Sequence, residues 1–325
     1  MTVIRTQVIG CGACLPERIL TNAQLARMVD TSDEWIASRT GIRRRHIVSD
    51  GETTVDLAVK SAERAIADAK IGADDIDLVI VATTTPNETF PSVATTVQSR
   101  IGMTRGAAFD VQAVCSGFIY GMAIADNFIK AKQAQTILLI GAETMSRLMD
   151  WTDRATCVLF GDGAGALVLR AGDGQGGPSD RGVFNTKLYS DGRLHDLLYV
   201  DGGPSTTGTT GHLRMLGKEV FKHAVINIAD SIVESARDSD VSVSEIDWFV
   251  PHQANQRILD ATARRLKVPT ERFISTIADH GNTSAASVPL ALDVAVQDGR
   301  IKRGDLVLLE AMGGGLTWGA ALLRW

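Results

Sequence analysis

The feature that most constrains the fold is an internal repeat with an offset of 170 residues. The strand-like segment 76–81 follows an apolar helical stripe, and the similar segment 246–250 follows a second stripe, with Asp77 and Asp247 in matching places. Farther along the chain, the apolar run at 137–140 matches the run at 307–310 at the same offset. Matched segments that recur in one order indicate a duplicated unit rather than a chance likeness between buried strands.

The repeat predicts an α/β fold made of two duplicated halves. Helical periodicity alternates with short, nearly continuous apolar runs, which favours layers of helices on a largely parallel sheet. Residues 171–178 are rich in glycine and proline and have no periodicity, so we expect the halves to span residues 1–172 and 173–325. Residues 201–212 form a second long irregular segment, of a kind that is often functional.

Composition narrows the class of protein. The 325 residues are 45% hydrophobic and 22% charged, as in soluble globular proteins. A net charge of −5 excludes a global basic field for nucleic acid or an anionic membrane. The four cysteines are too few for a disulfide framework, the apolar runs are too short to span a bilayer, and the first residues lack a secretion-signal pattern. We therefore expect a cytoplasmic protein with reduced thiols.

Three polar residues are candidates for chemistry. Cys115 precedes an apolar helical segment, and a helix N-terminus stabilises a thiolate, although buried cysteines are more often inert. His252 follows a strand-like segment and Asn282 lies in a turn. At an offset of 170 residues, the loop around Asn282 is the duplicate of the loop that carries Cys115. The repeat thus predicts that Cys115, His252 and Asn282 meet near one pseudo-symmetric centre.

Glycine clusters give two contrasting expectations. The run 313–315 would let the backbone approach a substrate and offer an N–H to a developing oxyanion. The segment 161–165 lacks the spacing of a nucleotide-binding loop and leads into an apolar strand, so we interpret it as a hairpin or tight turn. Cys11 and Cys14 have no second pair or nearby histidines to complete a metal site.

Four motifs together resemble one known family. They are Val-Cys-Ser-Gly-Phe at 114–118, Pro-His-Gln-Ala-Asn at 251–255, His-Gly-Asn-Thr-Ser-Ala-Ala-Ser at 280–287 and Gly-Gly-Gly-Leu-Thr-Trp-Gly at 313–319. The chain is similar over its whole length to β-ketoacyl-[acyl-carrier-protein] synthase III, the initiating condensing enzyme of bacterial type II fatty acid synthesis. The resemblance implies a thiolase-like fold with two duplicated halves in a five-layer αβαβα arrangement, and a homodimer. It implies no cofactor and no metal, since acyl-CoA is a substrate.

The resemblance also assigns catalytic roles. Cys115 would take the acyl group from acyl-CoA, with acetyl-CoA as the expected primer, and the N–H groups of Cys115 and Gly314 would form the oxyanion hole. His252 and Asn282 would stabilise the enolate that forms when malonyl-acyl carrier protein loses CO2. Such neutral donors lower the barrier to an enolate without a metal.

Binding residues follow from the same resemblance. Trp35, Arg39 and Arg154 would clamp the adenine of coenzyme A, and Phe90 would cross the dimer interface to close the partner's acyl pocket. A docking surface for the acidic carrier protein would consist of Arg257, Arg264 and Arg265. Leu216 and Lys218 depart from the family pattern, in which Asn is frequent in this loop, so no pantetheine contacts are assigned there.

Other functions compete with this one. A paralogous enzyme could use the same chemistry in polyketide or other secondary metabolism. A degradative thiolase needs a second cysteine near the C-terminal glycines, and no Cys follows Cys157. From a different class, the order Cys115, His252, Asn282 also matches papain-like cysteine hydrolases, but the local sequence around their cysteine is absent. A non-catalytic partner subunit is disfavoured because all three polar residues are present.

Overall fold

Two β-sheets with related topology form the frame of the protein. The computed structural model describes residues 2–325. In the first sheet the strands are ordered β1-β7-β6-β4-β5, and in the second β11-β12-β13-β8. The first five span Val3–Cys14, Asp162–Gly174, Thr136–Thr144, Leu78–Ala82 and Ala107–Val111, and the other four span Trp248–Pro251, Leu306–Gly313, Thr317–Arg324 and Gly182–Ser190.

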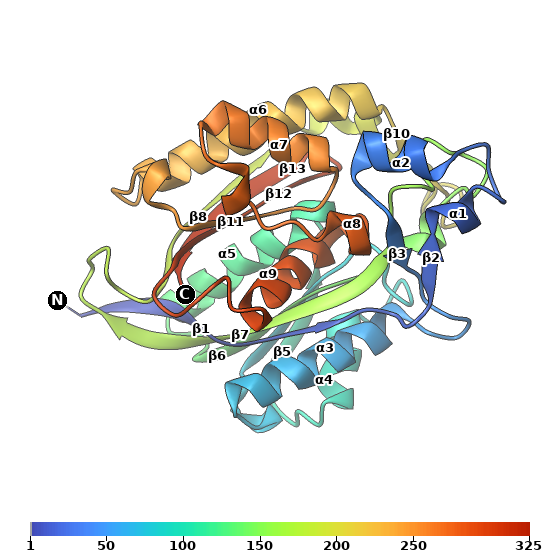
Figure 1. Cartoon of the computed structure of the whole chain (residues 1–325). Helices are drawn as coiled ribbons and strands as arrows, with labels where there is room; N and C mark the ends of the chain where they lie inside the picture. Colours follow the sequence, from blue (N-terminus) through green and yellow to red (C-terminus); the bar gives the residue numbers. More distant parts are fainter. Residues whose placement is uncertain (1) are drawn as a thin grey trace.

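Helices cover both sheets and fill the space between them. Figure 1 shows α5 and α9 between the sheets, α3 and α4 on the outer face of the first sheet, and α6 and α7 on the outer face of the second. These helices span Gly117–Lys130, Ser287–Gln297, Thr54–Ala69, Val93–Arg100, Gly217–Arg237 and Gln256–Leu266. The sequence of layers is helix, sheet, helix, sheet, helix. The expected five-layer αβαβα arrangement is therefore confirmed.

The 170-residue repeat is visible in the pairing of the strands. In the first sheet β4 runs parallel to β6 with Leu78 opposite Ile137, and in the second β11 runs parallel to β12 with Trp248 opposite Val307. The two central helices α5 and α9 begin at Gly117 and Ser287, again 170 residues apart. Equal offsets in register and helix starts show that both halves use the same local geometry. The division of the chain between residues 172 and 173 stays a prediction.

Short turns precede the central helices and also repeat. The 3₁₀ turns η2 (Val114–Ser116) and η7 (Ser284–Ala286) lead into α5 and α9. Val114 and Ser284 each have a φ of 50°, a left-handed conformation that costs free energy for residues with a side chain. The same uncommon conformation at duplicated positions places a sharp turn before each central helix, and the two turns contact each other.

Smaller elements surround one end of the sheets. They are β2 (Ile19–Thr21), α1 (Asn22–Leu25), α2 (Asp33–Thr40), β3 (Arg44–His46), β9 (Leu198–Val200), β10 (Leu213–Met215) and α8 (Ile277–His280). The remaining 3₁₀ turns are η1 (Ala73–Asp75), η3 (Met145–Leu148), η4 (Gly192–Leu197), η5 (Val243–Glu245) and η6 (Thr270–Arg272). Residues 201–212, expected to be irregular, connect β9 to β10. Within the described part of the chain, no helix combines the length and apolarity needed to cross a bilayer.

The glycines at 161–165 do not form the hairpin or tight turn expected from the sequence. Residues from Asp162 onward are already part of β7, which pairs with both β1 and β6. A Cβ atom on Gly165 would lie 2.7 Å from the Cβ of Pro289 in α9. These glycines therefore permit close packing of a central helix on the sheet, a requirement that local sequence does not reveal.

Candidate active site

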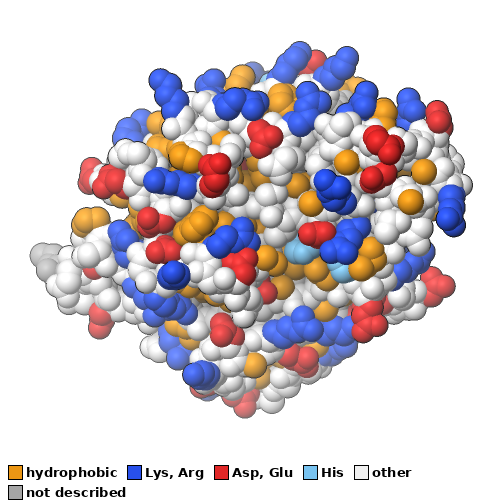
Figure 2. All heavy atoms as spheres, in the orientation of Figure 1, with side chains coloured by type: hydrophobic (Ala, Val, Ile, Leu, Met, Phe, Trp, Pro, Cys, Tyr) orange, Lys and Arg blue, Asp and Glu red, His pale blue; other side chains and the backbone are white. Residues whose placement is uncertain are grey.

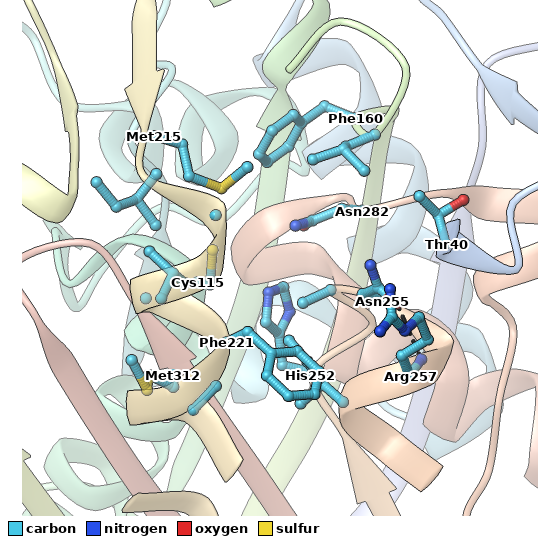
Figure 3. Close-up of a pocket in the computed structure, with 18 of the residues that line it drawn as sticks. Thr40, Cys115, Phe160, Met215, Phe221, His252, Asn255, Arg257, Asn282 and Met312 are labelled. Carbon is cyan, nitrogen blue, oxygen red and sulfur yellow. Dashed lines mark hydrogen bonds between the residues drawn. The ribbon is translucent and has the colours of Figure 1, made fainter. Parts of the chain in front are cut away.

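One cavity of about 550 Å³ reaches from the surface near α2 to the centre of the molecule. Cys115, His252, Asn282 and Gly313 all line it, and they come from η2, the end of β11, the loop after α8 and the end of β12. In Figure 3 the side chains of Cys115, His252 and Asn282 face a common space. The structure thus brings together the three residues that the repeat predicted to meet.

Cys115 lies at the turn before α5 and is only 3% exposed. Burial raises the pKa of its thiol to about 12, the negative charge of Glu143 adds to this rise, and a hydrogen bond with the Ser284 hydroxyl opposes it. A Cβ atom on Gly313 would lie 2.5 Å from the backbone N of Cys115. A glycine is therefore required at this point for the glycine run to lie against the nucleophile.

His252 is held from two directions as β11 ends. Its backbone N–H donates to the carbonyl of Glu310 at 2.8 Å, and its Nδ1 lies 2.6 Å from the Oγ of Ser287 in α9. Burial lowers the pKa of His252 to about 3. The imidazole is therefore neutral at physiological pH. In the tautomer in which the Ser287 hydroxyl donates to Nδ1, the ring proton resides on Nε2, from which it can be donated into the cavity.

The amide of Asn282 is oriented by its own loop. Its Oδ1 accepts the backbone N–H of Ser284 at 2.9 Å. Its main chain is fixed by a bond from its N–H to Leu159 O and by a bond from Gly161 N–H to its carbonyl. Because the side-chain oxygen already accepts a hydrogen bond, the amide nitrogen is the group that can donate one to a substrate. Figure 3 shows this nitrogen directed toward Cys115.

At the outer end of the cavity an aromatic ring is covered by two guanidinium groups. The Cζ of Arg39 lies 4.6 Å from the centroid of the Trp35 ring, and the Cζ of Arg154 lies 5.3 Å from it. Trp35 and Arg39 line the cavity, whereas Arg154 also donates to the carbonyl of Asp30. Such a stack offers flat, cationic surfaces at a cavity mouth.

Basic side chains continue from the mouth onto α7. Arg257 lines the cavity with its guanidinium 5.9 Å from the Phe221 ring centroid. Arg264 and Arg265 are exposed in the last turn of the helix, and Arg265 pairs with Asp230 at 3.2 Å. Figure 2 shows Lys and Arg side chains along the upper edge of the molecule, where Figure 1 places α6 and α7.

Phe90 lies away from the cavity of the single chain. Its side chain is 82% exposed, a large value for an aromatic residue, and it is not among the cavity-lining residues. A single exposed aromatic side chain is common on protein surfaces, so the exposure of Phe90 does not by itself define a contact.

Several residues of the site are not predicted by the sequence motifs. Ser284 and Ser287 lie in the Asn282 motif, three residues apart at a helix start, and that spacing was the available signal. Glu143 had no such signal, because its place beside Cys115 depends on packing. The apolar wall of the cavity, equally unforeseen, includes Met145, Phe160, Leu198, Leu213, Met215, Phe221 and Met312.

The side chains of Cys11 and Cys14 lie on opposite faces of β1. Cys11 belongs to the core between the sheets and Cys14 to the core beneath α3. From residue 2 to residue 325, no group of three or more Cys, His, Asp and Glu side chains is arranged to hold a metal ion.

The fold and the arrangement of Cys115, His252 and Asn282 define the class of the thiolase-fold condensing enzymes. The sequence profile described as 3-Oxoacyl-[acyl-carrier-protein (ACP)] synthase III matches residues 109–192, and its C-terminal counterpart matches residues 236–325. The chain belongs to the β-ketoacyl-[acyl-carrier-protein] synthase III family and is an acyltransferase. The resemblance stated from the four motifs is thereby confirmed.

Relatives from several bacteria support the assignment. The chain is 64% identical over 322 residues to the β-ketoacyl-[acyl-carrier-protein] synthase III of Rhodospirillum centenum, covering 99% of both chains. It is similar to the crystal structure of the Aquifex aeolicus synthase III, with 45% identity, a TM-score of 0.92 and coverage of 98% and 100%. The priming β-ketosynthase of the R1128 polyketide pathway has a TM-score of 0.90 but only 33% identity, with coverage of 98% and 96%. The papain-like hydrolase alternative is therefore wrong.

Proposed function

We propose that this enzyme condenses an acyl group from acyl-CoA with malonyl-acyl carrier protein, with loss of CO2, to give a β-ketoacyl-acyl carrier protein and so initiate type II fatty acid synthesis. The observation that carries the proposal is that a cysteine at a helix start, a neutral histidine and an oriented asparagine amide share one cavity. The chain is 64% identical to the β-ketoacyl-[acyl-carrier-protein] synthase III of Rhodospirillum centenum but only 33% identical to the polyketide priming enzyme, which favours fatty acid synthesis over secondary metabolism.

In the first half-reaction Cys115 is the nucleophile. Its thiolate attacks the thioester carbonyl of acyl-CoA, the bond from the carbonyl carbon to the coenzyme sulfur breaks, and coenzyme A leaves as the thiol. The N–H groups of Cys115 and Gly314 bind the transient oxyanion, since the run 313–315 lies against the turn of Cys115.

In the second half-reaction His252 and Asn282 act as neutral donors to the thioester carbonyl of malonyl-acyl carrier protein. As the carbon–carbon bond to the carboxylate breaks, the electron pair forms an enolate whose oxygen they stabilise. The enolate carbon then attacks the acyl-enzyme, and Cys115 is released. A pKa of about 3 for His252 suits this role, because a protonated imidazole would have to be desolvated at high cost in the closed site.

The surrounding residues bind the two substrates. Trp35, Arg39 and Arg154 hold the adenine of coenzyme A at the cavity mouth, because their planar groups already stack there. Arg257, Arg264 and Arg265 attract the acidic carrier protein to the same mouth. Phe90 enters the acyl pocket of a second copy, which accounts for its exposure in one chain. We further infer a cytoplasmic homodimer in which residues 1–172 and 173–325 share one site and do not act separately.

Intact-protein mass spectrometry after mixing with a panel of acyl-CoAs tests the first half-reaction. The expected result is a thioester adduct that maps to Cys115 and is absent in Cys115→Ser. The absence of an adduct with every acyl-CoA would refute the synthase function.

The second half-reaction is tested with His252→Ala and Asn282→Ala. Both variants should form the acyl adduct but fail to release CO2 from malonyl-acyl carrier protein. Loss of acylation with decarboxylation intact would contradict the roles given to these residues.

A further inference from the structure

The two proposed oxyanion donors lie on segments that are far apart in the sequence. The N–H of Cys115 belongs to η2, the turn before α5, and the N–H of Gly314 belongs to the hairpin between β12 and β13. At the base of that hairpin Gly313 pairs with Thr317, and residues 314–316 form its tip. Two donors bind one oxyanion well only if their spacing is held to within about 0.5 Å. The contacts that join the turn to the hairpin therefore set this spacing.

The side chain of Thr317 joins the two segments. Its hydroxyl donates to the carbonyl of Ala113 at 2.9 Å and accepts the hydroxyl of Ser116, the residue after the nucleophile, at 2.7 Å. The same hydroxyl lies 3.2 Å from the carbonyl of Gly314 in its own hairpin. Within the part of the chain that the structure describes, no other direct hydrogen bond joins the turn to the hairpin. One threonine hydroxyl thus carries the polar contact between the nucleophile turn and the glycine run.

Ser116 supports Thr317 in this position. In the contact between the two hydroxyls Ser116 is the donor, and each hydroxyl has one proton, so the proton of Thr317 remains for the carbonyls of Ala113 and Gly314. Ser116 has no solvent exposure, and a chain of hydroxyls of this kind strengthens each of its hydrogen bonds. Without the Thr317 hydroxyl, Ser116 can still donate to the Ala113 carbonyl, which lies 2.8 Å away. The turn would then keep its own hydrogen bonds but lose those to the hairpin.

We propose that Thr317 is a positioning residue for the oxyanion hole and that Ser116 supports it. The Thr317 hydroxyl fixes the spacing between the N–H groups of Cys115 and Gly314, and so speeds the step in which the thioester carbonyl becomes a tetrahedral oxyanion. Thr317 does not line the cavity, and it acts through these two backbone donors without forming a covalent bond or transferring a proton. Apolar packing also holds the segments together, but it has no directional preference, whereas a hydrogen bond does. This inference rests on the proposed acylation of Cys115.

The test compares single-turnover acylation by acetyl-CoA with alkylation by iodoacetamide, both followed by mass spectrometry. Alkylation uses the same Cys115 sulfur but displaces iodide directly, so no oxyanion forms. In Thr317→Val the acylation rate at saturating acetyl-CoA should fall at least about tenfold, because the oxyanion donors are no longer held in register. The acetyl-CoA concentration that gives half of the maximal rate and the rate of alkylation should both stay within about twofold of wild type.

Two further variants test the hydroxyl itself. Thr317→Ser keeps the hydroxyl and should acylate within about threefold of wild type. Ser116→Ala should slow acylation about threefold, because Thr317 keeps its bond to Ala113 but loses its support. The double variant Ser116→Ala/Thr317→Val should be no slower than Thr317→Val alone, since Ser116 acts through Thr317.

Thr6→Val is the matched control. Thr6 is another buried threonine whose hydroxyl joins two elements, because it donates from β1 to Asp126 Oδ1 in α5 at 2.7 Å. Neither Thr6 nor Asp126 lines the cavity. The variant should lower the melting temperature, while acylation and alkylation both stay within about twofold of wild type.

The outcomes separate this inference from the proposed function. If wild type forms no acyl adduct, the acylation itself is refuted. If wild type acylates and Thr317→Val acylates at the same rate, the positioning role is refuted and the synthase function stands. Equal losses of acylation and alkylation in Thr317→Val would also refute the role, because Thr317 would then act on the sulfur rather than on the oxyanion hole. If Thr317→Val does not fold, Ser116→Ala decides the question, and an unchanged ratio of acylation to alkylation in that variant refutes the proposal.

Discussion

Replacing Gly313 by alanine should displace the nucleophile without changing any polar group. The added Cβ would lie 2.5 Å from the backbone N of Cys115, 3.1 Å from its Cβ and 3.2 Å from its Cα. Ordinary van der Waals contact begins near 3.4 Å, so the turn of Cys115 or the end of β12 must move by about 1 Å. Both segments are buried and cannot move without displacing their neighbours. The overpacking should therefore lower the free energy of unfolding by about 1–3 kcal/mol.

The same displacement should also slow catalysis. A displacement of about 1 Å at a reacting atom costs on the order of a hundredfold in rate. The assay is the single-turnover rate of the Cys115 acyl adduct, measured with a thermal melt of the same sample. Gly177→Ala is the matched control, because nothing lies within 4 Å of its added Cβ. A Gly313→Ala enzyme with wild-type acylation and an unchanged melting temperature would refute the close packing of β12 on the nucleophile turn.

Three further predictions concern pH and substrate binding. Burial lowers the pKa of His280 to about 4, so the folded state excludes a proton that the unfolded chain accepts below about pH 6.5. The unfolding free energy of wild type should therefore fall by about 2 kcal/mol more than that of His280→Gln between pH 7.5 and pH 5, as denaturant titrations at both pH values would show. Trp35→Ala should raise the KM for acyl-CoA about tenfold with kcat nearly constant, and an unchanged KM would remove Trp35 from the coenzyme site. Arg257→Glu should raise the KM for malonyl-acyl carrier protein, but not for acyl-CoA, and the effect should shrink in high salt; equal effects on both substrates would argue for a shared contact instead.

The amino-acid sequence determined the plan of the fold and three members of the site. A 170-residue repeat is a property of the chain itself, and identical local patterns fold into identical strand pairs and helix starts. The same offset related the loops of Cys115 and Asn282, so their meeting followed from symmetry. His252 could also be predicted, because it is a polar residue directly after a buried strand and strand ends at one edge of a sheet lie close together.

The charge states, packing and hydrogen-bond partners of the site residues depend on the tertiary structure alone. The neutral state of His252 comes from its burial, and its ring is oriented by the contact with Ser287; neither is a property of its sequence neighbours. The glycines of β7 serve the packing of α9, although their sequence suggests a turn. Glu143 and Ser284 are 141 residues apart in the chain and bond only because both halves close around one centre. Periodicity records which face of an element is buried, whereas the distance between two polar atoms depends on how whole layers pack.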